Sequence, residues 1–138
     1  MKFKHLFITT LLSVSFLGCE DILDCVIGRS ASLPNKSFQV GIENIFYSDY
    51  ISAEVKNDPD DENYDYYFDL YGDLPEGLDY YVDNRLLIIE GVPTESGYFE
   101  FTVHLMVDGP IYYDYEDDTY HDPLCSESDS MTYGIVIE

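Results

Sequence analysis

Apolar and polar residues alternate along much of the chain after residue 37. The longest example is "YFEFTVHLMV" (98–107), in which every odd-numbered residue is apolar while Glu100, Thr102 and His104 lie between them. A period of two over ten residues predicts an antiparallel strand with one buried face. His104 should therefore lie on the outer, solvated face of this strand.

Shorter segments with the same period predict further strands at 38–42, 51–55 and 65–70. Segments 86–90 and 133–138 add two more, because they are rich in the β-branched and aromatic residues that strands favour. The residues expected on one face are Phe38, Val40 and Ile42 in the first, Ile51, Ala53 and Val55 in the second, and Tyr66, Phe68 and Leu70 in the third. No long segment after residue 18 has apolar residues at helical spacing. Six or seven short strands separated by turn residues favour an all-β, two-sheet sandwich over residues 37–138.

The first 18 residues have a different character. Lys2 and Lys4 precede the uncharged run "LFITTLLSVSFL", which ends at Gly18 and Cys19. A basic start, a short apolar run and a small residue describe an export signal, and the run falls short of the roughly 20 residues of a spanning helix. The Gly18-Cys19 ending resembles the lipobox of bacterial lipoproteins, whose cysteine is acylated and becomes the first residue. We expect a signal peptide over 1–18, lipidation at Cys19 and a tether over 19–36; the alternative is a buried N-terminal element with a structural cysteine.

The acidic residues that follow Cys19 point to a location. Glu20, Asp21 and Asp24 resemble the signal that directs lipoproteins of the Bacteroidota to the cell surface. Acyl chains would supply the membrane affinity, at roughly 0.8 kcal/mol per buried methylene. We therefore expect a lipid-anchored protein of the bacterial outer membrane or cell surface.

Charge excludes one class of partner. After residue 18 the chain keeps all 28 acidic residues but only Arg29, Lys36, Lys56 and Arg85, a net charge of −24. Such a field repels phosphate backbones, so nucleic-acid binding is excluded. The aromatic content of 16% separates the chain from acidic disordered proteins and predicts that it folds.

Two cysteines remain if Cys19 carries lipid. Cys25 and Cys125 are then an even pair in an oxidising compartment, where a disulfide is expected. The bridge would close a loop of about 100 residues, worth ~4 to 5 kcal/mol by chain entropy. A metal site is the alternative, but two separate cysteines without a neighbouring histidine do not favour it.

The segment "LPEGLDYYVDNRLLIIEGVPTESGYFEFTVHLMVD" (74–108) has the most specific pattern. It resembles the Ig-like domain family of bacterial surface proteins, which is related to the cadherin-like domains of dystroglycan. The matching positions are Leu74, Pro75, Gly77, Leu78, Gly91, Pro93, Gly97, Phe99, Phe101, Thr102, Val103 and Asp108. The resemblance implies an Ig-like sandwich of about seven strands. All of these positions turn the chain or fill a core, so they indicate architecture and not activity.

Catalysis finds no support in motifs. The patterns GxSxG, HExxH and the P-loop are absent, so we expect no enzyme and no cofactor. Two acidic loops, "NDPDDEN" (57–63) and "DYEDDTYHD" (114–122), offer oxygen ligands to calcium without the EF-hand spacing. The calcium candidates are Asp58, Asp60, Asp61, Asp114, Asp117 and Asp118, with solvated acidic loops as the alternative.

Tyrosine is abundant, with 14 copies and no tryptophan. Most copies fit half-buried strand positions, which tyrosine favours. Tyr112, Tyr113 and Tyr115 are different because they follow the Asp108-Gly109-Pro110 turn in an expected loop, where binding residues collect. We expect a non-catalytic surface lipoprotein whose domain serves in binding, structure or adhesion and whose ligand is a glycan or a protein. The alternatives are a carbohydrate-binding accessory lipoprotein of a glycan-uptake system and a subunit of a larger envelope complex.

Overall fold

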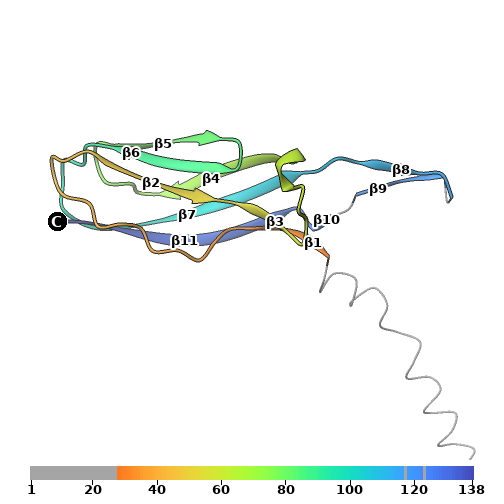
Figure 1. Cartoon of the computed structure of the whole chain (residues 1–138). Helices are drawn as coiled ribbons and strands as arrows, with labels where there is room; N and C mark the ends of the chain where they lie inside the picture. The colour runs from red at the N-terminus through yellow and green to blue at the C-terminus, as the bar shows by residue number, and fades with distance from the viewer. Residues whose placement is uncertain (1–27, 117, 123) are drawn as a thin grey trace, which may run out of the picture.

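The computed structural model of the chain describes residues 28–116, 118–122 and 124–138. Two three-stranded antiparallel sheets lie face to face (Figure 1). One has the order β11 (Ser128–Ile137), β7 (Gly97–Asp108), β4 (Asp65–Gly72), and the other has the order β2 (Tyr47–Ser52), β6 (Leu86–Gly91), β5 (Leu78–Asp83). The predicted all-β sandwich is confirmed.

A third, smaller sheet joins the sandwich at one side. Its order is β10 (Leu124–Ser126), β1 (Arg29–Ser32), β3 (Glu54–Lys56), with β1 parallel to β10 and antiparallel to β3. Strand β1 also packs against β7 and β11. The 3₁₀ turn η1 (Asp61–Asn63) precedes β4, and the hairpin of β8 (Tyr112–Asp114) and β9 (Thr119–His121) follows β7.

The core lies between the two larger sheets. Phe101, Val103, Leu105 and Val107 of β7 are buried and face residues such as Ile89 of the other sheet. Phe99 is half-buried at the end of the same face, and His104 lies on the outer face, as predicted. Full burial of an aliphatic or aromatic side chain stabilises the fold by roughly 1.5–3 kcal/mol, so this alternation supplies much of the driving force.

The strand predicted at 38–42 is wrong. Within the described residues, this segment pairs with a strand only through a single parallel bridge between Gly41 and Ile137. Val40 and Ile42 are 56% and 52% exposed instead of buried. Gly41 is the residue that faces β11, because a Cβ there would lie 2.5 Å from the Ile137 side chain. The close approach of this backbone to β11 turns the two neighbouring apolar side chains outward.

The strand predicted at 51–55 is divided between two sheets. Ile51, Ala53 and Val55 are all buried, as the pattern predicted. However, β2 ends at Ser52 and β3 begins at Glu54, so the chain leaves one sheet and enters another. The Ala53 N–H donates to the Arg85 carbonyl at 2.9 Å at the point of transfer.

The described part of the expected tether belongs to the packed fold. Residues Arg29–Ser32 form β1, and Ala31 and Leu33 are buried in the core. The Leu33 N–H donates to the Asp129 carboxylate at 2.7 Å, and the Tyr133 hydroxyl donates to the Pro34 carbonyl at 2.9 Å. The packed domain thus begins before residue 37, the boundary expected from sequence.

Candidate binding surface

The hairpin of β8 and β9 extends beyond the end of the sandwich (Figure 1). Its register pairs Tyr112 with His121, Tyr113 with Tyr120 and Asp114 with Thr119. The hairpin lies at the same end of the molecule as β1, and the C-terminus lies at the opposite end (Figure 1). An acidic turn joins the strands, with Asp118 in the left-handed conformation at φ 59°.

Tyrosine rings gather on this hairpin. The Tyr113 ring lies 4.9 Å from the Tyr115 ring and 5.0 Å from the Tyr120 ring between centroids, both edge to face. Such pairs contribute roughly 0.5–1.5 kcal/mol each, which orders the cluster. Tyr115 is nevertheless 90% exposed and Tyr120 75% exposed. We call Tyr112, Tyr113, Tyr115 and Tyr120 the tyrosine hairpin.

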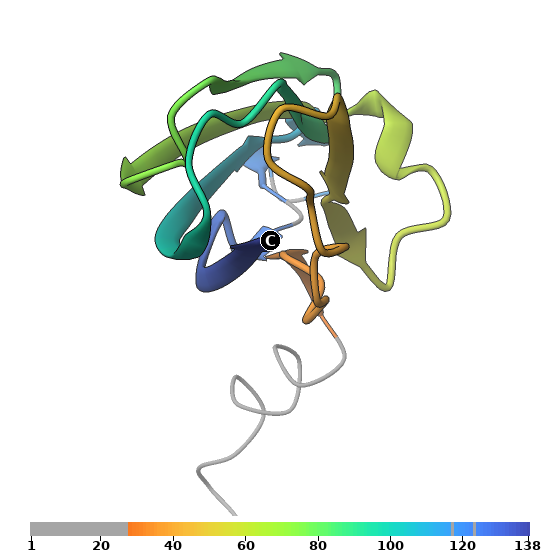
Figure 2. The same cartoon turned by 90° about the vertical axis from the view of Figure 1, so that its left-hand side faces the viewer.

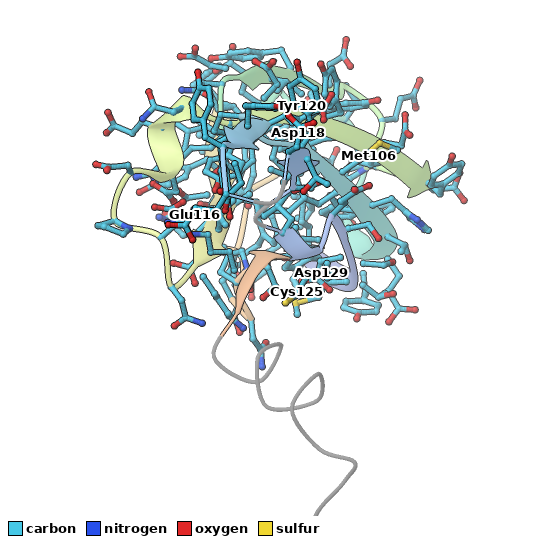
Figure 3. The ribbon with its side chains drawn as sticks, turned by 90° about the vertical axis from the view of Figure 1, so that its right-hand side faces the viewer. Met106, Glu116, Asp118, Tyr120, Cys125 and Asp129 are labelled. Atoms are coloured by element: carbon cyan, nitrogen blue, oxygen red, sulfur yellow. The ribbon has the colours of Figure 1, made fainter. Side chains whose placement is uncertain are left out.

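Acidic groups surround these rings. Asp114 belongs to β8, and Glu116 and Asp118 follow it in the turn of the hairpin, with Asp118 labelled beside Tyr120 in Figure 3. The Tyr113 hydroxyl donates to the Asp118 carboxylate, which raises the pKa of Tyr113. Residues 109–122 contain no lysine or arginine. The surface can therefore offer ring faces and hydrogen-bond acceptors to neutral or cationic partners, and it repels anions.

The structure places the three tyrosines selected from sequence together at the β8–β9 hairpin. Tyr113 and Tyr115 are in ring contact, and Tyr112 lies one residue earlier on the same strand. The expected loop is instead a short hairpin, and sequence reasoning missed Tyr120. The signal for Tyr120 was the pairing of "YYD" (112–114) with "TYH" (119–121) across a short acidic turn, which places Tyr120 opposite Tyr113.

A second, shallow surface lies on the outer face of the β11-β7-β4 sheet. A groove of about 530 Å³ runs over this face, lined by Asp69, Tyr71, His104, Met106 and Ser130 among others. The His104 and Tyr71 rings meet edge to face, 5.0 Å apart between centroids. His104 is opposite Asp69 on β4 and Ser130 on β11 in the register. The groove is open to solvent along the sheet.

The first calcium loop is held by arginine side chains. The Asp58 carboxylate accepts a hydrogen bond of 2.6 Å from the Tyr64 hydroxyl and lies 3.2 Å from Arg29 Nε. The Tyr64 bond is the main reason why the pKa of Asp58 is lowered. The Asp61 carboxylate oxygens lie 2.7 and 2.9 Å from Arg85 Nη1. Protein cations therefore neutralise two of the three carboxylates proposed for this loop.

The second calcium loop belongs to the tyrosine hairpin. Asp114 accepts the Glu116 N–H at 2.8 Å, Asp118 accepts the Tyr113 hydroxyl, and Asp117 lies outside the described residues. Over residues 28–116, 118–122 and 124–138, no three His, Cys, Asp or Glu side chains are grouped so that they could hold a metal ion. Calcium binding stays a prediction.

The predicted anchor and disulfide fall largely on residues that are not described. Cys19 and Cys25 lie outside the described residues. Cys125 belongs to β10 and is disulfide-bonded. Its pairing with Cys25 stays a prediction. No helix in the described part of the chain has the length and apolar character needed to cross a membrane.

Comparison with known proteins does not assign the chain to a family. No family model matches the chain, and no curated protein matches it. Among solved structures, a crystal structure of "a putative alpha-galactosidase" from Bacteroides fragilis is similar, with a TM-score of 0.47 and 17% sequence identity. The similarity covers 80% of this chain and 18% of that one, so this chain spans less than a fifth of that protein's length. A similarity at this level establishes neither a shared fold nor a shared activity.

Proposed function

We propose that the chain is a non-catalytic lipoprotein of the bacterial outer membrane or cell surface, anchored through Cys19, whose sandwich presents the tyrosine hairpin to a ligand. The observation that carries the binding role is the exposure of Tyr115 and Tyr120 around the central Tyr113 ring. Tyrosines at 90% and 75% exposure bury little area in the fold, whereas large amphipathic rings with few rotatable bonds are well suited to contact a partner.

The form of the surface supports recognition over catalysis. The hairpin projects beyond the end of the sandwich (Figure 1), and the groove on the outer face of the β11-β7-β4 sheet is open to solvent. Rigid scaffolds commonly carry binding residues on such projecting segments. The Ig-like resemblance of residues 74–108 agrees with a module that displays loops and hairpins from a stable core.

A carbohydrate-binding accessory role in glycan uptake is the second candidate. It is favoured by exposed tyrosine rings beside carboxylate acceptors, since sugar C–H faces pack on aromatic rings and sugar hydroxyls donate to carboxylates. The acids at 114, 116, 118 and 122 would exclude uronic and sulfated sugars, so the glycan would be neutral.

The test begins with the protein isolated from cell membranes. Intact mass should match a chain acylated at Cys19, and a protease added to whole cells should remove the domain. The same protein is then applied to arrays of neutral glycans, acidic glycans and surface proteins. Neutral glycans or proteins should bind, and acidic glycans should not.

Variants of the hairpin decide whether it is the contact surface. The double variant Tyr115→Ala/Tyr120→Ala should weaken binding at least about tenfold, or 1.4 kcal/mol. It should change the free energy of unfolding by no more than about 1 to 3 kcal/mol, the contribution of the two ring pairs with Tyr113, and leave the protein folded. Tyr98→Ala is the matched control, since Tyr98 is also exposed but begins β7 at the opposite end of the sandwich. An unacylated chain, or binding equally strong in the double variant, would contradict the proposal.

A further inference from the structure

The sandwich is open along the side where β4 and β5 lie. Each is the last strand of its sheet, β4 next to β7 and β5 next to β6. They lie next to each other at the upper left of the end-on view (Figure 2). A groove of about 770 Å³ runs between them, lined by Tyr66, Tyr67, Phe68 and Asp69 of β4, by Val82 of β5 and by Met106 of β7. The small β10-β1-β3 sheet, by contrast, packs at another side of the sandwich.

Strand β5 has core-facing side chains that the described residues cover only in part. Tyr80 is paired with Ile89 and Val82 with Leu87 in the β5–β6 register, so both share the inner face with these buried residues. Ile89 and Leu87 are fully buried, whereas Tyr80 is 36% and Val82 42% exposed. The opposite sheet ends at β4 and does not reach over them. One more strand beside β4 would cover this part of the inner face.

Strand β4 has an unprotected edge. It spans eight residues, "DYYFDLYG", and pairs within the described residues with β7 alone. Natural edges are commonly blocked by proline, by charged side chains, lysine above all, or by a bulge. Strand β4 contains no proline or lysine and pairs with β7 in unbroken register, and its charges are the outward Asp65 and Asp69, which repel acidic strands only. Its outer backbone N–H and C=O groups can therefore accept a further strand.

Charge defines what that strand must carry. Asp65 and Asp69 lie on the outer face of β4, and Asp108 is directly opposite Asp65 on β7. Strands β4 and β5 contain four aspartates and no basic residue. Outward side chains of an added strand would be cross-strand neighbours of Asp65 and Asp69, where basic residues are stabilising and acidic ones are not. Its inward side chains would contact Val82 and Tyr80.

We propose that the β4 edge binds an extended segment of another protein in which apolar and basic residues alternate. The segment adds a strand to the β11-β7-β4 sheet, with apolar side chains in the β4–β5 groove and basic side chains beside Asp65 and Asp69. A second copy of this chain does not fit, because its net charge of −22 gives repulsion between copies and its few basic residues do not alternate with apolar ones. This edge is separate from the tyrosine hairpin, so the two proposals can fail independently.

The test uses the protein isolated from cells and a capped ten-residue peptide of alternating valine and lysine as the probe. The peptide should bind and protect β4 backbone amides from hydrogen exchange. A peptide of alternating valine and glutamate should not bind. N-methylation of alternate backbone nitrogens on the bonding edge of the valine–lysine peptide should weaken binding at least tenfold, since it blocks strand pairing and keeps the charge.

Two charge-reversal variants distinguish local binding at the β4 edge from attraction by the net charge of the whole protein. Asp65→Lys/Asp69→Lys should weaken binding of the valine–lysine peptide at least tenfold. Glu43→Lys/Glu54→Lys makes the same change in net charge at exposed positions away from β4 and should retain most of the affinity. Equal loss in both variants, binding that survives N-methylation, or no added protection of β4 would each overturn the proposal. So would a stable dimer of the protein with protected β4 amides in the absence of peptide.

Discussion

Asp49 is a buried carboxylate of β2 that is surrounded by hydrogen-bond donors. Lys36 Nζ lies 2.6 Å from Oδ1, the Tyr50 N–H donates to Oδ1 at 2.8 Å, and the Gln39 N–H donates to Oδ2 at 3.0 Å. Burial acts to raise the pKa of Asp49, but the hydrogen bonds from Lys36 and the two backbone groups outweigh it, and the net pKa is lowered. Lys36 also lies over the Phe38 ring at 4.7 Å. The group fastens residues 36–39 to β2.

Replacing this carboxylate should destabilise the fold in a pH-dependent way. Asp49→Asn leaves Lys36 without its charged partner and should cost about 2 kcal/mol at neutral pH. Because the folded pKa of Asp49 is lowered, its contribution is present above its unfolded pKa of about 4 and is lost as pH falls through the folded pKa. Urea unfolding of both proteins across the acid range should show the difference shrinking as pH falls.

The exposed variant Glu54→Gln is the control for the loss of one negative charge. It should change the free energy of unfolding by less than about 0.5 kcal/mol. A constant difference between the wild type and Asp49→Asn at all pH values would contradict the role given to Asp49.

The turn before β5 depends on two glycines whose backbones approach each other. Gly77 has φ 93°, and the Leu78 N–H closes the turn on the Pro75 carbonyl at 3.0 Å. A Cβ on Gly77 would lie 2.1 Å from the Val92 carbonyl oxygen, and one on Gly91 would lie 2.1 Å from the Gly77 carbonyl oxygen. The backbone atoms cannot yield as a side chain could. This contact holds the start of β5 against the end of β6.

Gly77→Ala should therefore destabilise the protein by at least about 2 kcal/mol, from the left-handed backbone and the backbone clash together. Thermal or urea unfolding measures the effect. Glu76→Ala, in the same turn but with an exposed side chain, should have a much smaller effect. Equal stability of Gly77→Ala and the wild type would show that the turn relaxes.

Some elements could be predicted from sequence and others could not. Strands β4 and β7 were predictable because each buries one face over a long, regular alternation. Strand β1 was not, because its four residues show no clear period and its partners lie far away in sequence, and β3 was predicted only as the end of a longer strand at 51–55. The Asp49–Lys36 pair was missed for a similar reason, since Lys36 stands in a segment with the composition of a linker. Tyr112, Tyr113 and Tyr115 were selected from a turn signal, but Tyr120 required knowledge of the hairpin register.

At the scale of the whole molecule, buried tyrosines hold packed segments together, and Tyr133 connects two that are distant in sequence. Burial raises the pKa of Tyr64, Tyr66 and Tyr133 to about 12 each, and nearby aspartates add to the shift. Tyr133 donates to Pro34, and Tyr66 donates to the Asp61 carbonyl at 2.9 Å. The protonated phenols are favoured by the folded state.

The fold should therefore weaken in alkali. A raised folded pKa contributes stability that is fully present below the unfolded pKa of about 10 and is lost as pH rises through about 12. Tyrosinate absorbance should show exposed tyrosines ionising first and a later group that ionises together with unfolding. Tyr133→Phe should retain the fold at neutral pH and unfold at a higher pH than the wild type. Ionisation of all tyrosines in one step near pH 10, without unfolding, would contradict this prediction.

The common end shared by β1 and the tyrosine hairpin sets how the protein would stand on a cell. Gly28 is nine positions after Cys19, and a fully extended chain of that length spans at most about 30 Å. With Cys19 acylated, the end that carries β1, β10 and the hairpin would face the bilayer, and the C-terminal end would face outward (Figure 1). Tyr115 and Tyr120 would then meet neighbours in the same membrane, in a cis arrangement, before they met anything on an opposing cell.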